Sequence, residues 1–217
     1  MIDVKQQISS VRRTVGSRVL EAGTARVATI SQVYDTDADD LWDAVTDAER
    51  ISRWFLPITG DLRVGGRYQF QGNAGGTVER CTRPTGFAAT WEYGDEVSWI
   101  EVRLTPEGDA RTRFELEHVA HVDDERWAQF GPGAVGVGWD SGLMGLSLYL
   151  WSGGRSMDPQ ESAAWVASDD GRMFMTLSSD AWCEASIAAG ADETEARAAA
   201  ERTTAAYTAV PEQPGEA

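Results

Sequence analysis

One segment, residues 40–70, constrains the fold more than any other part of the chain. It reads DLWDAVTDAERISRWFLPITGDLRVGGRYQF. The apolar spacing of its first half predicts a short amphipathic helix, and Asp47 can cap a second turn of that helix. Pro57 ends the helix because proline cannot continue it. A turn follows, and two glycines then open the strand RYQF. This order of helix, break and strand predicts an α+β fold.

The residues that follow predict an antiparallel meander of four or five half-buried strands. The expected strands lie at residues 67–70, 77–81, 87–93, 97–106 and 111–119. In the last of these, alternate side chains face opposite ways: Phe114, Leu116 and His118 on one side, Arg113, Glu115 and Glu117 on the other. Such alternation is typical of a sheet with one wet face.

The two flanks of this region predict further helices and one hairpin. Apolar residues recur at helical spacing between residues 3 and 15, which predicts a short helix. Residues 17–34 read as two β-branched runs around an Ala-Gly turn, which predicts a hairpin. After Trp151 the sequence predicts only helices: one opened by Asp158-Pro159, one over about 169–189 and one over about 192–209.

A glycine-rich helix is predicted between the meander and these last helices, from about residue 138 to residue 151. Its apolar stripe consists of Trp139, Leu143, Leu146 and Leu150. Gly142 and Gly145 lie beside that stripe, and each costs about 0.5–1 kcal/mol relative to alanine inside a helix. Either close packing on the sheet or space for a ligand must therefore need the room.

The composition excludes several classes of partner. The net charge of −16 repels nucleic acid phosphates and anionic membrane surfaces, so neither is an expected partner. Two widely spaced cysteines, Cys81 and Cys183, make neither a disulfide framework nor a zinc site. No cofactor or metal is expected. The sequence begins without an apolar leader and has no apolar run of about 18 residues, which predicts a cytoplasmic protein.

One motif resembles a nucleotide-binding sequence and is rejected as such. Residues 131–136 read GPGAVG, which fits the pattern G-x-G-x-x-G ahead of a helix. The dinucleotide motif requires a hydrophobic strand directly before it, in a parallel βαβ unit. The preceding residues, DDERWAQF, are acidic and do not resemble a strand. We expect the glycines to let the chain turn into the helix.

Several segments resemble the START-like (SRPBCC) superfamily, in the branch named for the heat-shock-protein-90 ATPase activator. They are VYDTDADDLWDAVTDAERISRWFLP, GDLRVGGRYQF, TWEY, TRFELEHV and GWDSGLMGLSLYL. The resemblance implies a helix-grip fold, in which a curved antiparallel sheet wraps around a long helix and leaves a cavity between them. It divides the chain into an N-terminal helix with the first hairpin arm (1–23), the helix-grip domain (24–151), a helical extension packed on the core or on a partner (152–210) and a flexible tail (211–217).

The same resemblance implies which side chains line the cavity. We expect nine residues at this site, the polar His118 and eight others: Trp54, Phe55, Tyr68, Phe70, Trp91, Phe114, Trp139 and Leu143. His118 shares a strand face with two apolar residues, so it is either a core histidine bonded to a neighbour or the polar handle of the pocket. It is the candidate acid/base if the protein is an enzyme. No serine lies in a G-x-S-x-G elbow.

The sequence is compatible with three functions. The first is non-catalytic binding of a small hydrophobic molecule between sheet and helix. The second, implied by the branch name, is a protein-interaction module such as a co-chaperone or stress-response partner. The third is a polyketide cyclase or dehydratase that uses His118, with Tyr68 as its candidate partner. The helical extension could pack on its own core or mediate a homodimer, because Ala196, Ala199, Ala200, Thr203 and Tyr207 form a small-residue face.

Overall fold

An eight-stranded antiparallel sheet forms the framework of the protein. The computed structural model describes residues 3–108, 110–156 and 158–209, so the predicted tail at 211–217 lies outside the described residues. The strand order is β1-β2-β8-β7-β6-β5-β4-β3. The strands are β1 (Arg12–Leu20), β2 (Gly23–Tyr34), β3 (Ile58–Gly60), β4 (Arg67–Phe70), β5 (Gly75–Thr82), β6 (Gly86–Tyr93), β7 (Glu96–Pro106) and β8 (Thr112–Ala120).

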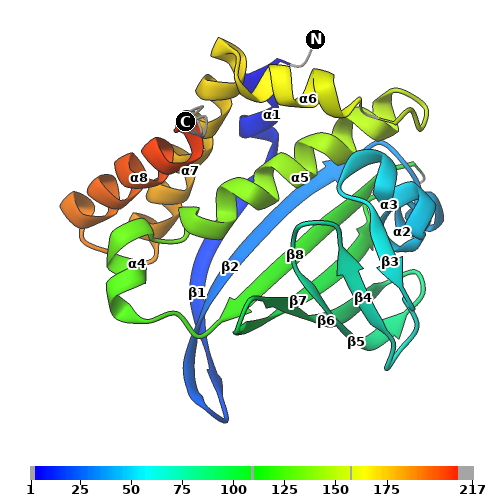
Figure 1. Cartoon of the computed structure of the whole chain (residues 1–217), viewed down its shortest axis with the longest axis horizontal. Helices are drawn as coiled ribbons and strands as arrows, with labels where there is room; N and C mark the ends of the chain where they lie inside the picture. Colours follow the sequence, from blue (N-terminus) through cyan, green and yellow to red (C-terminus); the bar gives the residue numbers. More distant parts are fainter. Residues whose placement is uncertain (1–2, 109, 157, 210–217) are drawn as a thin grey trace, which may run out of the picture.

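The sheet curves around one long helix, α5 (Gly133–Trp151), which crosses its inner face (Figure 1). Two short helices, α2 (Ala38–Thr46) and α3 (Ala48–Trp54), cover one end of the same face. Asp47 ends α2 and caps α3, accepting a hydrogen bond from the backbone N–H of Arg50, as its position in the sequence predicts. The predicted α+β, helix-grip arrangement is confirmed.

The core lies where the inner strand faces meet α5. Ile30, Leu116 and Val102 lie side by side across β2, β8 and β7, and all three are buried. Apolar side chains paired across strands in this way stabilise a sheet by their contact with one another. Leu143 and Leu146 of α5 belong to the same buried cluster. Strand alternation and helix periodicity therefore converge on one core.

The predicted helix over residues 3–15 is wrong in its second half. Helix α1 spans only Val4–Ser10, and β1 begins at Arg12. Val15 faces Ala28 of β2 as a strand residue. The apolar spacing continues past Ser10 by coincidence, and pairing with β2 decides the conformation of the β-branched residues that follow.

The predicted start of the glycine-rich helix is also wrong. Helix α5 begins at Gly133, so much of the GPGAVG motif lies inside its first turns. The acidic segment before it forms a helix of its own, α4 (Asp124–Phe130), and Asp123 caps it by accepting from the backbone N–H of Arg126. Every strand pair in the described sheet is antiparallel, which leaves no parallel βαβ unit around the motif.

In the described part of the chain three helices follow α5: α6 (Pro159–Val166), α7 (Asp169–Ala188) and α8 (Glu193–Thr208). Together with α1 they gather beyond α5, away from β3 to β6 (Figure 1). Asp158 and Asp192 cap α6 and α8 through backbone N–H groups, as predicted. The small-residue face of α8 is buried against its own chain, where Thr203 donates to the carbonyl oxygen of Phe130 and is 1% exposed.

A buried ionic network joins β1, α5 and α7. The guanidinium of Arg13 donates two hydrogen bonds to the carboxylate of Asp140, with N–O distances of 2.9 and 2.6 Å. Ser178 Oγ and Trp182 Nε1 donate to the same carboxylate, at 2.6 and 3.0 Å. The Arg13 and Asp140 side chains are 5% and 1% exposed. Both charges are paired and hydrogen-bonded, as buried charges require.

Candidate functional site

An apolar pocket of about 130 Å³ lies between the inner face of the sheet, helix α5 and the α2–α3 pair. Eight of the nine residues expected at the site lie on its lining: Trp54, Phe55, Tyr68, Phe70, Trp91, Phe114, Trp139 and Leu143. No Asp, Glu, Lys, Arg or His is among the described residues that line it. An uncharged, aromatic-walled space of this kind is typical of a site for a small apolar molecule.

Several lining residues were not expected from the sequence. They include Val45, Ile51, Leu62, Cys81 and Phe87. Gly142, which was predicted to leave room for packing or for a ligand, also borders the pocket. Phe87 shares a strand face with Ala89 and Trp91, so strand alternation could have identified it. Leu62 lies in a loop, where no periodicity points to a shared face. Cys81 is exposed but borders the pocket.

The pocket walls are a chain of aromatic rings from different elements. The Phe55 and Phe70 rings are perpendicular, with centroids 5.0 Å apart. The ring centroids of Phe70 and Trp91 are 5.6 Å apart, and those of Trp91 and Trp139 of α5 are 4.9 Å apart. All three centroid separations fall in the range of roughly 4.5–7 Å that is typical of aromatic pairs, and the Phe55–Phe70 pair has the favoured edge-to-face arrangement. The rings therefore hold one another in place around the space.

Most polar hydrogens on the lining are already bonded within the protein. Trp54 Nε1 donates to the carbonyl oxygen of Ala44 at 2.9 Å. Thr46 Oγ1 donates to the carbonyl oxygen of Trp42 at 2.7 Å. The Tyr68 hydroxyl donates to the carbonyl oxygen of Thr90 at 2.6 Å, and burial, followed by the nearby Glu92 carboxylate, raises its pKa. At neutral pH Tyr68 is therefore an uncharged wall residue.

His118 lies behind the wall and is not among the residues that line the pocket. Its Nδ1 accepts a hydrogen bond from Trp139 Nε1 at 3.0 Å, and its Nε2 lies 2.8 Å from Ser98 Oγ. Indole nitrogen can only donate, so Nδ1 is the acceptor and Nε2 carries the proton. Ser98 Oγ in turn donates to the carbonyl oxygen of Trp91 at 2.9 Å. The histidine is thus a bonded core residue that orients Trp139.

The electrostatics of His118 agree with this role. Its side chain is 5% exposed, and burial lowers its pKa from the ordinary 6.5 to about 4. The imidazole is neutral at pH 7, and both ring nitrogens are engaged. Of the two interpretations made from the sequence, the geometry favours the core histidine over the polar handle.

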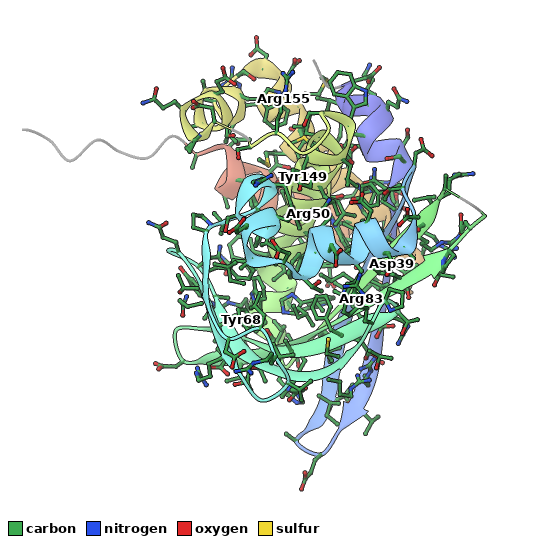
Figure 2. The ribbon with its side chains drawn as sticks, turned by 90° about the vertical axis from the view of Figure 1, so that its right-hand side faces the viewer. Asp39, Arg50, Tyr68, Arg83, Tyr149 and Arg155 are labelled. Atoms are coloured by element: carbon green, nitrogen blue, oxygen red, sulfur yellow. The ribbon has the colours of Figure 1, made fainter. Side chains whose placement is uncertain are left out.

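Polar contacts outside the pocket fix the α2–α3 wall in place. Arg50 Nε donates to the Tyr149 hydroxyl at 2.8 Å, and Arg50 Nη1 donates to Asp40 at 2.8 Å. Figure 2 shows Arg50 of α3 beside Tyr149 of α5, and Arg83 reaching toward Asp39 of α2. Burial alone would raise the pKa of Asp40, but hydrogen bonds from Arg50 and Thr36 outweigh it and lower the pKa. These bonds tie the helix pair to α5 and to the sheet.

Other candidates from the sequence do not form sites. Arg67 of β4 forms a salt bridge with Glu92 of β6, with an N–O distance of 2.7 Å. Cys183 is buried on α7, far from Cys81 in the sequence, and burial raises the pKa of its thiol. Within the described ranges, no three His, Cys, Asp or Glu residues are grouped so that they could hold a metal ion. No described helix is long and apolar enough to cross a membrane.

Comparison with known proteins places the chain in a family. Residues 35–150 match the model of the family described as "Activator of Hsp90 ATPase homolog 1-like protein". The crystal structure of CalU16 from Micromonospora echinospora shares 34% sequence identity over 81% of this chain and 97% of that chain, with a TM-score of 0.62. The chain belongs to the AHSA1 family. The solution structure of CalU16 agrees, with 33% identity, 83% and 97% coverage and a TM-score of 0.68.

More distant solved structures share only the fold with this chain. Protein MLL2253 from Mesorhizobium loti is 20% identical over 58% of this chain and 98% of that chain, with a TM-score of 0.53. No curated protein matches the chain significantly. The CalU16 likeness covers more of the chain than the AHSA1 family model does, so it extends into the flanking elements.

Proposed function

We propose that this AHSA1-family protein binds a small hydrophobic molecule, without catalysis, in the pocket between sheet and α5. The observation that carries the proposal is the lining, which combines eight aromatic rings with aliphatic side chains and no charged group. An apolar molecule leaving water for such a surface gains free energy in proportion to the area it buries.

The size of the pocket sets the expected affinity. A ring that buries about 150–250 Å² at about 25 cal/mol per Å² gains roughly 4–6 kcal/mol. This corresponds to a dissociation constant between about 1 mM and about 0.05 mM for a single-ring probe. A larger natural ligand would bind more tightly where the α2–α3 wall moves to admit it.

A filling variant tests the site directly. Gly142 borders the pocket, and a Cβ there would lie 3.6 Å from the Phe55 ring, which is an ordinary contact. Gly142→Leu should fill the space and abolish toluene binding, while the added side chain favours the helix. Gly142→Ala is the matched control and should retain binding. Binding is measured from the indole N–H signals of Trp54 and Trp139 in NMR titrations.

The outcomes separate clearly. Saturable shifts in the wild type and in Gly142→Ala, but none in Gly142→Leu, support the proposal. The proposal fails if the wild type shows no saturable shift, or if the leucine variant binds as the wild type does. Native mass spectrometry of the protein against a hydrophobic metabolite panel then identifies the natural ligand.

The enzymatic alternative has no support from the geometry. A cyclase would need an acid or base that reaches the substrate. His118 is held behind Trp139 with both nitrogens bonded, and Tyr68 is bonded to a backbone carbonyl.

A protein-interaction role rests on a different observation, the family description together with the net charge of −16. We infer that such a partner would meet the acidic surface and leave the pocket untouched. A pull-down with Gly142→Leu that recovers the same stoichiometric partner as the wild type would favour this second role.

A further inference from the structure

The pocket offers a ligand almost no polar group. Six lining side chains carry a polar hydrogen: Thr46, Trp54, Tyr68, Cys81, Trp91 and Trp139. Four of these hydrogens are donated to other parts of the protein. Only the Cys81 thiol and the Trp91 indole have no hydrogen-bond partner among the described residues. A ligand therefore meets at most one strong donor.

This inventory limits the charge of a ligand. A carboxylate or ammonium group would lose its hydration on entry and would find no counter-charge on the lining. The carboxylate of Asp140 and the guanidinium of Arg13 bond each other on the other side of α5. This pocket therefore excludes charged molecules more strongly than a pocket with one free Arg or Glu side chain would.

The walls limit the shape of a ligand. Phe55 and Phe70 are perpendicular, and Phe70, Trp91 and Trp139 follow in a tilted row. A flat ring placed among them extends the series with edge-to-face contacts, whereas a saturated ring of equal carbon number is thicker and has no ring quadrupole. The cavity of about 130 Å³ is close to the roughly 150 Å³ of an engineered apolar cavity that stays dry and binds benzene.

We propose that the pocket selects uncharged, flat aromatic molecules of about one ring, or one such ring of a larger molecule, and rejects charged and saturated ones. This inference rests on the proposed function, since it names the chemical class of the ligand at the same site. The selectivity arises because the protein uses its own polar hydrogens to hold the aromatic walls.

A matched series of probes tests the proposal on the whole chain. Toluene, methylcyclohexane and benzoate share a six-membered ring with one substituent and differ in aromaticity and charge. Each is titrated into protein with ¹⁵N-labelled tryptophan, and binding is followed from the indole N–H signals. We expect toluene to bind at least threefold more tightly than methylcyclohexane, although the saturated ring is the more hydrophobic. We expect benzoate to bind at least a hundredfold more weakly than toluene.

Two further variants test the role of the lining hydroxyls. Tyr68→Phe and Thr46→Val each remove one hydroxyl whose hydrogen bond holds part of the pocket wall, and each should reduce the preference for toluene over methylcyclohexane by at least twofold. These variants keep the apolar wall, so a folding failure in one leaves the wild-type probe series and the other variant as tests.

Each outcome decides either the proposed function or the ligand class. If no probe binds, the proposed function and the ligand class both fail. If methylcyclohexane binds as tightly as toluene, or benzoate binds within tenfold of it, hydrophobic binding stands and aromatic selectivity is overturned. An unchanged preference for toluene in folded Tyr68→Phe and Thr46→Val proteins overturns the claim that these hydrogen bonds give the walls their aromatic selectivity.

Discussion

Both sides of helix α5 carry glycine, but the space around the glycine differs between the two sides. On the outer side, Gly136 lets α7 approach so closely that an added Cβ would lie 2.3 Å from the Trp182 ring. On the inner side, an added Cβ at Gly142 would meet only the edge of Phe55, at 3.6 Å. The outer side is filled by protein and carries a paired charge, Asp140, whereas the inner side is uncharged and leaves space. A glycine in this helix can therefore indicate either tight packing or an open pocket.

The largest expected effect concerns the charged outer side. Asp140→Ala leaves the Arg13 guanidinium buried without its counter-charge, bonded only to the carbonyl oxygens of Ile8 and Val11, so we expect a loss of about 3–5 kcal/mol in the free energy of unfolding. Chemical denaturation measures it. The double variant Arg13→Met/Asp140→Asn removes both charges and should be more stable than the sum of the single variants by at least about 1 kcal/mol. Strict additivity would show that the pair is not coupled.

The second effect belongs to the inner side and depends on pH. The pKa of His118 is about 4 in the folded protein and near 6.5 when unfolded, so between these values the unfolded chain binds more protons. The contribution of His118 to the free energy of unfolding is therefore fully present above pH 6.5. It falls as the pH drops toward 4, by up to about 3 kcal/mol. The difference between wild type and His118→Gln across this range isolates the effect. Parallel pH profiles would contradict the prediction.

The third test compares the glycines by the same substitution. Gly136→Ala places a methyl group inside the Trp182 ring contact, and we expect a loss of about 1–3 kcal/mol because neither helix can move freely. Thermal unfolding measures the change. In a Trp182→Leu background, Gly136→Ala should lower the stability by less than it does in the wild type, because the smaller leucine side chain makes room for the methyl group.

The smallest effect has the opposite sign. Gly142→Ala should stabilise the protein by about 0.5–1 kcal/mol, because alanine favours the helix and the methyl group meets only an ordinary contact. A destabilised Gly142→Ala protein would mean that the inner side is as tightly packed as the outer side, and the contrast between the two sides would disappear.

Local signals made much of the fold predictable from the sequence. The caps at Asp47, Asp158 and Asp192 act within one helical turn, and strand alternation acts within one strand. The resemblance to a known family predicted the eight apolar pocket residues, and six of them also lie on inward strand faces or on the apolar stripe of α5, whereas Trp54 and Phe55 lie at the end of α3.

What could not be predicted depends on distant partners. Arg13 and Asp140 are 127 positions apart, so nothing local indicates that they pair. The end of α1 at Ser10 depends on pairing of the next residues with β2. The choice between the two interpretations of His118 depended on Trp139 and Ser98, which come from α5 and β7.

The long sequence separation of the Arg13–Asp140 pair has a consequence for synthesis. Strand β2 faces β8, with Ile30 opposite Leu116, so the first hairpin has no sheet to join until β8 has left the ribosome. Arg13 has no ion-pair partner until Asp140 is synthesised. Asp140 in turn lacks two of its hydrogen-bond donors until Ser178 and Trp182 of α7 are synthesised. Distant pairings of this kind slow folding because a long loop must close, at a cost in chain entropy, before the favourable contacts form. The walls of the pocket are thus translated before the helix that braces them from outside, and a chain stalled before α7 would have the complete lining but an unsupported α5.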